Sequence, residues 1–300
     1  MKLNQRRFRH LLTTVSAAAM IAGLSAEANA ACQVVSSVSF PVTTTTDCIV
    51  VSSPFVGSIV IAPTGSVLNQ FGAGPTATTH AIAVTSTLSG SIQNSGSVLA
   101  EELGPVTSPQ RFAIDVSLGG LITQGITNSN QIKAFATKTA IGIFSGTSSF
   151  AGGIVNNVSG LIQGFTNRNA VIGATSVGQA EGIELIGHTF NGGIFNAGTI
   201  VGNAIITSAD TTNHAAAFGI QDFVSTFSGG ITSSGTIFAH AQAAGATNLT
   251  SVAAGIIVGA ATSLFGSPVP AGTFFGGITN SGMIQVTSAN GVGAGIGVAV

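Results

Sequence analysis

The sequence predicts an all-β fold: a parallel β-helix, or β-solenoid, with three short strands per coil and loops of variable length. Three aliphatic columns recur down the chain, the second member about eleven residues after the first and the third six residues after the second. The segments around them are rich in Gly, Ser, Thr and β-branched residues and have a period of two, which is typical of strands. A recurring unit of this length indicates coils that stack and bury one another's apolar faces.

The middle column is the clearest of the three. The sequence is Gly-Gly-Ile-Phe-Asn-Ala-Gly-Thr-Ile at 192–200 and Gly-Gly-Ile-Thr-Asn-Ser-Gly-Met-Ile at 276–284. The third member follows the middle one after six residues in five copies, whereas the copy at Ile154 reaches Ile162 two residues late. The middle residues, 28 to 47 positions apart, are Ile92, Ile126, Ile154, Ile194, Ile231 and Ile278.

The first column precedes the middle one by ten to twelve residues in five copies. In the last copy the interval from Ile256 to Ile278 is twenty-two residues, and the extra segment contains Pro268 and Pro270. Changes in length are therefore expected in loops, while the apolar frame is kept.

Three further columns follow the same alignment. Four residues before the middle Ile stand the large apolar residues Leu88, Ile122, Phe150, Phe190, Phe227 and Phe274. Two residues after it stand Asn94, Asn128, Asn156, Asn196, Ser233 and Asn280, whose amides are predicted to hydrogen-bond up and down the stack. Four residues after it stand Gly96, Asn130, Val158, Gly198, Gly235 and Gly282, mostly residue types that tolerate positive φ, so a left-handed turn is predicted there.

Residues 1–30 have the features of a secretory signal peptide. Lys2, Arg6, Arg7 and Arg9 form a basic start, residues 11–26 are apolar, and Ala-Asn-Ala at 28–30 has the small-x-small form of a cleavage site. Removal of this segment leaves four basic against eight acidic residues, a formal net charge of −4. Nucleic acid and anionic membranes are therefore poor candidates for partners.

Residues 31–79 are predicted to form an N-terminal capping region, and residues 80–300 to form the β-helix repeats, the last of which is unfinished. Cys32 and Cys48 are the only cysteines, sixteen residues apart. In an exported chain they are expected to form a disulfide that staples the capping region, stabilising it by about 3 kcal/mol in the chain-entropy model. The alternative, a reactive or metal-binding pair, lacks nearby ligands.

Catalytic residues would have to be carboxylates gathered on neighbouring coils, as in a polysaccharide-cleaving β-helix. Asp115 and Glu184 share a column one residue after the first Ile, with Phe144 between them, so they are expected about 9 to 10 Å apart. That separation is near the upper end of the range for an inverting glycosidase. The competing interpretation is that Asp115, Glu181, Glu184 and Asp222 are solvated outward residues, and it is favoured because these coils have few basic side chains and the chain has no Tyr or Trp.

No cofactor or metal site is expected. His80, His188, His214 and His240 lie in different units, and none has a second ligand at a metal-like spacing. The Gly-Gly pairs precede strands rather than helix N-termini, so they do not match phosphate-binding loops.

The Gly-Gly-Ile-x-Asn-x-Gly-x-Ile copies, behind a signal peptide and an early cysteine pair, resemble the passenger region of bacterial autotransporters, the self-exporting proteins of type V secretion. The resemblance covers about residues 80–300. It implies a β-helix exported through the inner membrane of a Gram-negative bacterium to its outer surface or the medium, and used for adhesion, aggregation or presentation of a loop. Such proteins also have an outer-membrane β-barrel, which the 300 residues do not contain, so the barrel is expected in cis in a longer chain or in trans.

The sequence thus predicts a non-catalytic surface scaffold or adhesin, with an unidentified host or cell-surface ligand and a capacity to self-associate. A carbohydrate-active hydrolase or lyase is the alternative, and it depends on Asp115 and Glu184 alone.

Overall fold

The structure, a computed structural model, describes residues 32–35, 40–71, 80–102, 110–117, 119–146, 149–168, 175–209, 212–259 and 272–298. The chain divides into the units Met1–Ala31 and Cys32–Val300. The first unit, on which the predicted signal peptide falls, lies outside the described residues. No helix long and apolar enough to cross a membrane occurs in the described part.

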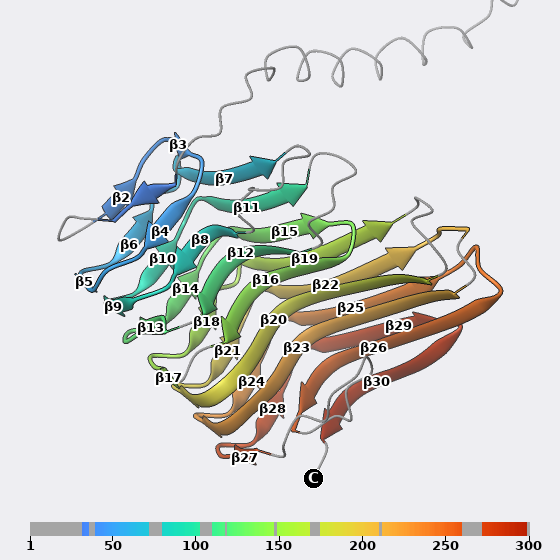
Figure 1. Ribbon diagram of the computed structural model, residues 1–300. Helices are drawn as coiled ribbons and strands as arrows, with labels where there is room; N and C mark the ends of the chain where they lie inside the picture. The colour runs from blue at the N-terminus through green and yellow to red at the C-terminus, as the bar shows by residue number, and fades with distance from the viewer. Residues whose placement is uncertain are drawn as a thin grey trace, which may run out of the picture. The chain divides into compact units, whose positions relative to one another are not determined.

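The second unit is an all-β solenoid of parallel sheets, as the sequence predicted. The chain passes from sheet A to sheet B to sheet C and back to sheet A, so each strand pairs with its counterpart one coil away (Figure 1). Every sheet pairing in the described residues is parallel, as in the contact of β10 with β14 or of β20 with β23.

Sheet A carries the first column and sheet B the middle column. The strands of sheet A are β1 (Gln33–Val34), β4 (Ile49–Val51), β8 (His80–Val84), β12 (Gln110–Ser117), β16 (Thr139–Gly146), β20 (Thr175–Asn191), β23 (Thr212–Ser228), β26 (Asn248–Val258) and β30 (Gly291–Val298), with β17 (Ser149–Phe150) and β27 (Thr273–Phe274) attached. Those of sheet B are β2 (Phe40–Val42), β6 (Ile59–Ile61), β10 (Ile92–Asn94), β14 (Ile126–Asn128), β18 (Ile154–Asn156), β21 (Ile194–Asn196), β24 (Ile231–Ser233) and β28 (Ile278–Asn280).

Sheet C carries the third column, and a small sheet D lies between sheets A and B in the early coils. The strands of sheet C are β3 (Thr45–Thr46), β7 (Ser66–Phe71), β11 (Ser97–Glu102), β15 (Gln131–Ala136), β19 (Leu161–Arg168), β22 (Thr199–Ile206), β25 (Thr236–Ala243) and β29 (Met283–Ala289). Those of sheet D are β5 (Phe55–Val56), β9 (Thr87–Ser89) and β13 (Leu121–Ile122). In the later coils the strand of sheet A is long: β20 and β23 have 17 residues each.

The three aliphatic columns form the core. Ile126 pairs with Ile92 and Ile154, Ile143 pairs with Ile183, and all five side chains are buried in one cluster. The stretched copy keeps its register, because Leu161 and Ile162 still pair with their counterparts in the next coil. The two extra residues fall within 157–159, in the turn before β19.

The large apolar column stacks its aromatic rings. Consecutive ring centroids are 4.9 Å apart for Phe150 and Phe190, 5.0 Å for Phe190 and Phe227, and 4.7 Å for Phe227 and Phe274. These spacings match the distance between neighbouring strands, about 4.8 Å, so the rings follow the backbone ladder.

The Asn column forms the predicted hydrogen-bonded ladder. Nδ2 of Asn94 donates to Oδ1 of Asn128 at 2.8 Å, Asn128 to Asn156 at 2.9 Å, and Asn156 to Asn196 at 2.8 Å. Asn196 then donates to Oγ of Ser233 at 3.1 Å. The amides also donate to backbone carbonyls in the next turn, as from Asn156 to Thr199. Each buried amide therefore donates hydrogen bonds both to the side chain of the next coil and to a backbone carbonyl of the turn.

The last described coil differs from those before it. Ile278 is only half-buried and Asn280 is exposed, whereas the earlier ladder residues are buried. No described strand stacks on the free side of β28, and Asn280 donates instead to the Gly282 carbonyl within its own turn.

The coils begin earlier than the sequence pattern indicated. Ile59 pairs with Ile92, and Ile49 pairs with Ile82, so the segment assigned to a separate cap already contains strands of sheets A, B and C. The pattern failed to show this because Ile61 stands where later coils have Asn, opposite Asn94.

The predicted left-handed turn after the Asn column is wrong. Among the described residues, positive φ occurs instead at the Gly-Gly pair before the middle Ile, for example 111° at Gly192 and 71° at Gly193. At Gly235 the requirement is space: a Cβ there would lie 2.0 Å from the carbonyl oxygen of Gly198 in the previous coil. Glycine after the Asn column therefore permits close stacking of the turns.

Asn156→Ala tests the ladder. The substitution leaves Asn128 without its Oδ1 acceptor and Asn196 without its donor, which should lower the free energy of unfolding by about 1 to 3 kcal/mol. Asn280→Ala, at the exposed end of the same column, should change it by less than about 0.5 kcal/mol. Urea unfolding followed by far-UV circular dichroism measures both. Equal effects of the two substitutions would contradict the ladder's role.

Candidate functional site

The polar residues of interest lie on the outer face of sheet A. Ala180 faces the inner apolar clusters, so Glu181 faces outward. Gly182 and Ile183 then both face inward: a Cβ on Gly182 would meet Cγ2 of Ile200 at 2.3 Å, and Ile183 is in the core. Alternation resumes with Glu184 on the outside. This break brings residues two before and one after the first Ile to the same outer face.

Contacts between neighbouring coils confirm that these two outer columns meet. The rings of Phe112 and Phe144 lie 5.0 Å apart, and Nδ1 of His80 lies 3.4 Å from Oδ2 of Asp115. In both pairs the first residue is two positions before its first-column Ile, and the second is one position after the Ile of the next coil.

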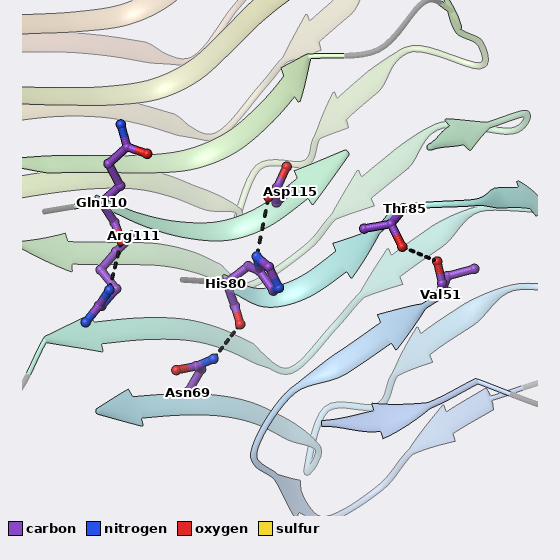
Figure 2. A network of polar contacts seen from close by, with 7 residues as sticks. All are labelled: Val51, Asn69, His80, Thr85, Gln110, Arg111 and Asp115. Atoms are coloured by element: carbon purple, nitrogen blue, oxygen red, sulfur yellow. Dashed lines mark hydrogen bonds and ion pairs between the residues drawn. The ribbon is translucent and has the colours of Figure 1, made fainter. Parts of the chain in front are cut away.

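The His80–Asp115 contact joins β8 to β12 (Figure 2). The backbone carbonyl of His80 accepts a hydrogen bond from the side-chain amide of Asn69, on β7. Asp115 is buried, and its Oδ1 atom has no hydrogen-bond partner among the described residues. The imidazole of His80 thus contacts one of the two carboxylate oxygens of Asp115.

Arg111 lies on the opposite face of β12, pairs with Ala140 and is fully buried. Its Nη1 atom donates to the Gln110 carbonyl at 2.9 Å (Figure 2). Burial lowers the pKa of Arg111, while the charge of Glu102 acts in the opposite direction. The sequence analysis did not predict that this side chain turns inward.

Glu181 and Glu184 are not solvated, which corrects the sequence-based interpretation. Glu181 is 0% exposed and Glu184 6% exposed. Nε2 of Gln179 donates to Oε1 of Glu181, and Nε2 of Gln221 donates to Oε1 of Glu184 at 3.3 Å. Glu181 is covered on both sides along its column, by Ile141 and Phe218. Outward orientation therefore does not give solvent access on this face.

Burial governs the ionisation of the two glutamates. It raises the pKa of Glu184 to about 8. It raises the pKa of Glu181 well above its usual range; the charge of Glu184 adds to that rise, and the hydrogen bond from Gln179 opposes it. Desolvation disfavours a carboxylate unless an opposite charge is near. Within the described residues, neither glutamate forms an ion pair.

Asp222 was also predicted to be solvated, and it too is buried. It pairs with Leu185 and with Val258, which lies in the core, so its carboxyl faces inward. Burial raises the pKa of Asp222 to about 7, although a hydrogen bond from the Val224 backbone N–H to Oδ1, at 3.2 Å, acts in the opposite direction. The sequence pattern did not distinguish this inward position.

The predicted alignment of Asp115 and Glu184 is correct in register. Asp115 pairs with Phe144, and Phe144 pairs with Glu184, so the two carboxyls are two strand spacings apart. Two surface cavities, of about 290 and 160 Å³, contain neither residue. The first is lined by residues between Gln33 and Thr46, and the second lies beside the Asn ladder around Phe195.

Cys32 and Cys48 form the predicted disulfide, with their Cα atoms 4.6 Å apart. The backbone N–H of Gln33 donates to the Cys48 carbonyl at 2.7 Å, so the staple lies beside the pairing of β1 with β4. It links the first two described strands of sheet A.

Within the described ranges, no three His, Cys, Asp or Glu side chains gather as metal ligands. His240 contacts Oγ1 of Thr287 at 2.6 Å. His188 lies on β20 and His214 on β23, away from the His80–Asp115 pair along the sheet.

Comparisons of the chain with family models, with curated proteins and with solved structures found no match.

The raised pKa of Asp222 predicts how the free energy of unfolding depends on pH. In the folded chain Asp222 stays protonated up to about pH 7, whereas in the unfolded chain it ionises near pH 4, so the folded state binds the extra proton between these values. The free energy of unfolding should therefore be highest near or below pH 4 and fall as the pH rises to 7. Asp222→Asn should flatten that fall by up to about 1.4 kcal/mol per pH unit.

The measurement is urea unfolding between pH 4 and pH 8. Asp47→Asn, at an exposed position, is the matched control and should leave the wild-type curve unchanged. A pH profile of Asp222→Asn that matches the wild type would contradict the assignment.

Proposed function

We propose that this chain is an exported, non-catalytic β-solenoid that serves at the cell surface as a scaffold or adhesin, in the manner of an autotransporter passenger. The observation that carries the proposal is the Cys32–Cys48 disulfide, within the first coils of the solenoid. Structural disulfides persist in oxidising compartments, outside the cytoplasm. The predicted signal segment at 1–30 supports the same conclusion.

The outer face of sheet C is the contact surface in this proposal. It carries half-buried aromatic side chains in two places. The rings of Phe135 and Phe165, on adjacent coils, are 5.7 Å apart, and those of Phe238 and His240, on one strand, are 6.2 Å apart. Aromatic side chains on an exposed face offer large contact areas to a ligand. Their separation from the core suits a binding role better than a packing role.

The carbohydrate-active alternative has weaker support. Asp115 and Glu184 have the register that an inverting pair needs, and Glu184 has the raised pKa of a general acid. Both are buried, and Phe144 stands between them where a sugar and the attacking water would have to lie.

Export is tested by fractionating producer cells and blotting with an antibody against residues 192–237. The proposal predicts a protein outside the inner membrane whose Cys32 and Cys48 resist alkylation until a reductant is added. A variant lacking residues 1–30 is the control, and it should stay in the cytoplasm with both thiols alkylated. A full chain found in the cytoplasm with free thiols would refute export.

The adhesive face is tested with purified chain and whole producer cells. Phe165→Ser and Phe238→Ser should reduce the amount of chain bound to cells about tenfold, because each removes an aromatic contact from sheet C. Phe195→Ser, which changes an aromatic residue that is 46% exposed on sheet B, is the control and should bind as the wild type does. Absence of binding by the wild type would leave a scaffold without an adhesive role.

A further inference from the structure

The last described coil, formed by β27 to β30, exposes side chains whose counterparts in the coil before it are buried (Figure 1). Ile296 is 46% exposed, whereas Ile256, its counterpart one coil earlier, is 0% exposed. Ile284 is half-buried, although Ile237 before it is fully buried. Within the described residues, no strand pairs with the free side of β28, β29 or β30. This end of the stack is therefore an unpaired apolar face.

The backbone of β29 has hydrogen-bonding groups that point away from the stack. The N–H of Met283 donates to the Gly235 carbonyl, in the coil before it. Successive residues of a strand direct their N–H and C=O groups to opposite sides, so those of Ile284, Val286 and Ser288 face the free side. A row of unpaired groups of this kind is a template for pairing with the strand of another chain.

The described part of this coil lacks the features that usually protect a sheet edge. Charged side chains, proline and short strands are the common means of protection. β29 and β30 have 7 and 8 residues, and neither contains proline. No Asp, Glu, Lys or Arg occurs in the sequence after Asp222. The edge is long, uncharged and open to pairing.

The opposite end of the stack is protected. The strands β1, β2 and β3 have only 2, 3 and 2 residues. In β2 the N–H of Phe40 donates to the Ser58 carbonyl of the next coil. The following residue, Pro41, therefore stands where an N–H would face the free side, and proline has none. Head-to-tail stacking of copies is disfavoured at this end.

A second copy of this chain fits the exposed face. An uncharged face meets an identical face without repulsion, whereas like charges placed opposite each other would destabilise the contact. Contacts between coils within the stack show that its apolar columns pack on like residues, as Ile284 packs on Ile237. The strands β27 to β30 contain 2, 3, 7 and 8 residues, roughly the 20 to 30 residues a side of a stable interface.

We propose that two copies of this chain dimerise end to end through their last coils, with β29 of one copy antiparallel to β29 of the other. Val286 is the middle residue of β29, so a two-fold axis beside it lets Val286 exchange both backbone hydrogen bonds with Val286 of the second copy. Ile284 then lies opposite Ser288 of the second copy. Such a contact uses the same surface twice and closes, so it gives a dimer rather than a fibre.

β29 suits this role better than β30. Its sequence, Met-Ile-Gln-Val-Thr-Ser-Ala, contains three β-branched residues, which favour strands. The sequence of β30, Gly-Val-Gly-Ala-Gly-Ile-Gly-Val, has glycine at every second residue, and glycine weakens a strand.

Sedimentation velocity of the purified chain, freed of the predicted signal segment at 1–30, tests the interface. The wild type should sediment as a dimer at micromolar concentrations. Val286→Pro removes an N–H that faces the free side and leaves the hydrogen bonds to β25 in place. It should raise the dissociation constant of the dimer about tenfold or more, because each copy loses a donor and the ring occupies the space of the facing strand.

Val34→Pro is the matched control at the other end of the stack. The N–H of Gln33 donates to the Cys48 carbonyl, so the N–H of Val34, on β1, likewise faces a free side. The same substitution there should leave the dimer as stable as that of the wild type. Far-UV circular dichroism verifies that both variants are folded.

Cysteine cross-linking tests the register. Gln285 and Thr287 are exposed, and pairing centred on Val286 places Gln285 opposite Thr287 of the second copy, with about 4.5 Å between their Cα atoms. That distance permits a disulfide. A mixture of Gln285→Cys and Thr287→Cys chains should therefore form a linked dimer on non-reducing electrophoresis, and Gln285→Cys chains alone should form much less.

Four results would overturn the proposal. They are a wild-type chain that is monomeric, a wild-type chain that forms open-ended polymers, a dimer that Val34→Pro weakens as much as Val286→Pro does, and a cysteine mixture that gives no linked dimer.

Discussion

Parallel stacking of like residues is the constraint on which the rest of this structure depends. Each residue of a coil lies about one strand spacing from its counterpart in the next coil. Identical side chains in a column must therefore interact favourably with one another. Ile on Ile, Phe on Phe and Asn on Asn all meet this condition. The Phe ring centroids are 4.7 to 5.0 Å apart, and the hydrogen bonds between Asn side-chain amides are 2.8 to 2.9 Å long. Like charges do not, because charges of one sign directly opposite each other repel. A charged content of only 6% follows from the architecture.

The acidic residues of sheet A fit the same rule. Each outward carboxylate has uncharged neighbours on the adjacent coils, as Glu181 has in Ile141 and Phe218. Those neighbours remove the repulsion but also remove the water, so the carboxyls of Glu181 and Glu184 become buried and burial raises their pKa values. The same stacking that keeps like charges apart thus leaves Glu181 and Glu184 buried among uncharged side chains.

Features that recur from coil to coil could be predicted from the sequence. Features that depend on the surroundings of a single residue could not. The Ile, Phe and Asn columns could be aligned because each recurs in many coils, and Cys32 and Cys48 could be paired because the chain has no other cysteine. The first coils were not predicted, because Ile61 stands where later coils have the Asn of the ladder. The left-handed residues were assigned to the wrong glycines, since periodicity does not separate a need for positive φ at Gly193 from a need for space at Gly235. The position of Glu181 on the outer face depends on a break in alternation at Gly182, and a single residue of that kind has no periodic signal.

Cross-linking across sheet B tests the stacking register most directly. Thr127 and Val155 are outward neighbours in adjacent coils, so cysteines at both positions should form a disulfide with a Cα separation inside the allowed range of about 4.4 to 6.8 Å. Cysteines at Thr127 and Phe195 are two coils apart, beyond that range, and should stay reduced within one chain. A bond between 127 and 155 alone, seen by mass spectrometry after proteolysis, is the predicted result. A bond between 127 and 195, or no bond in either variant, would contradict the parallel ladder.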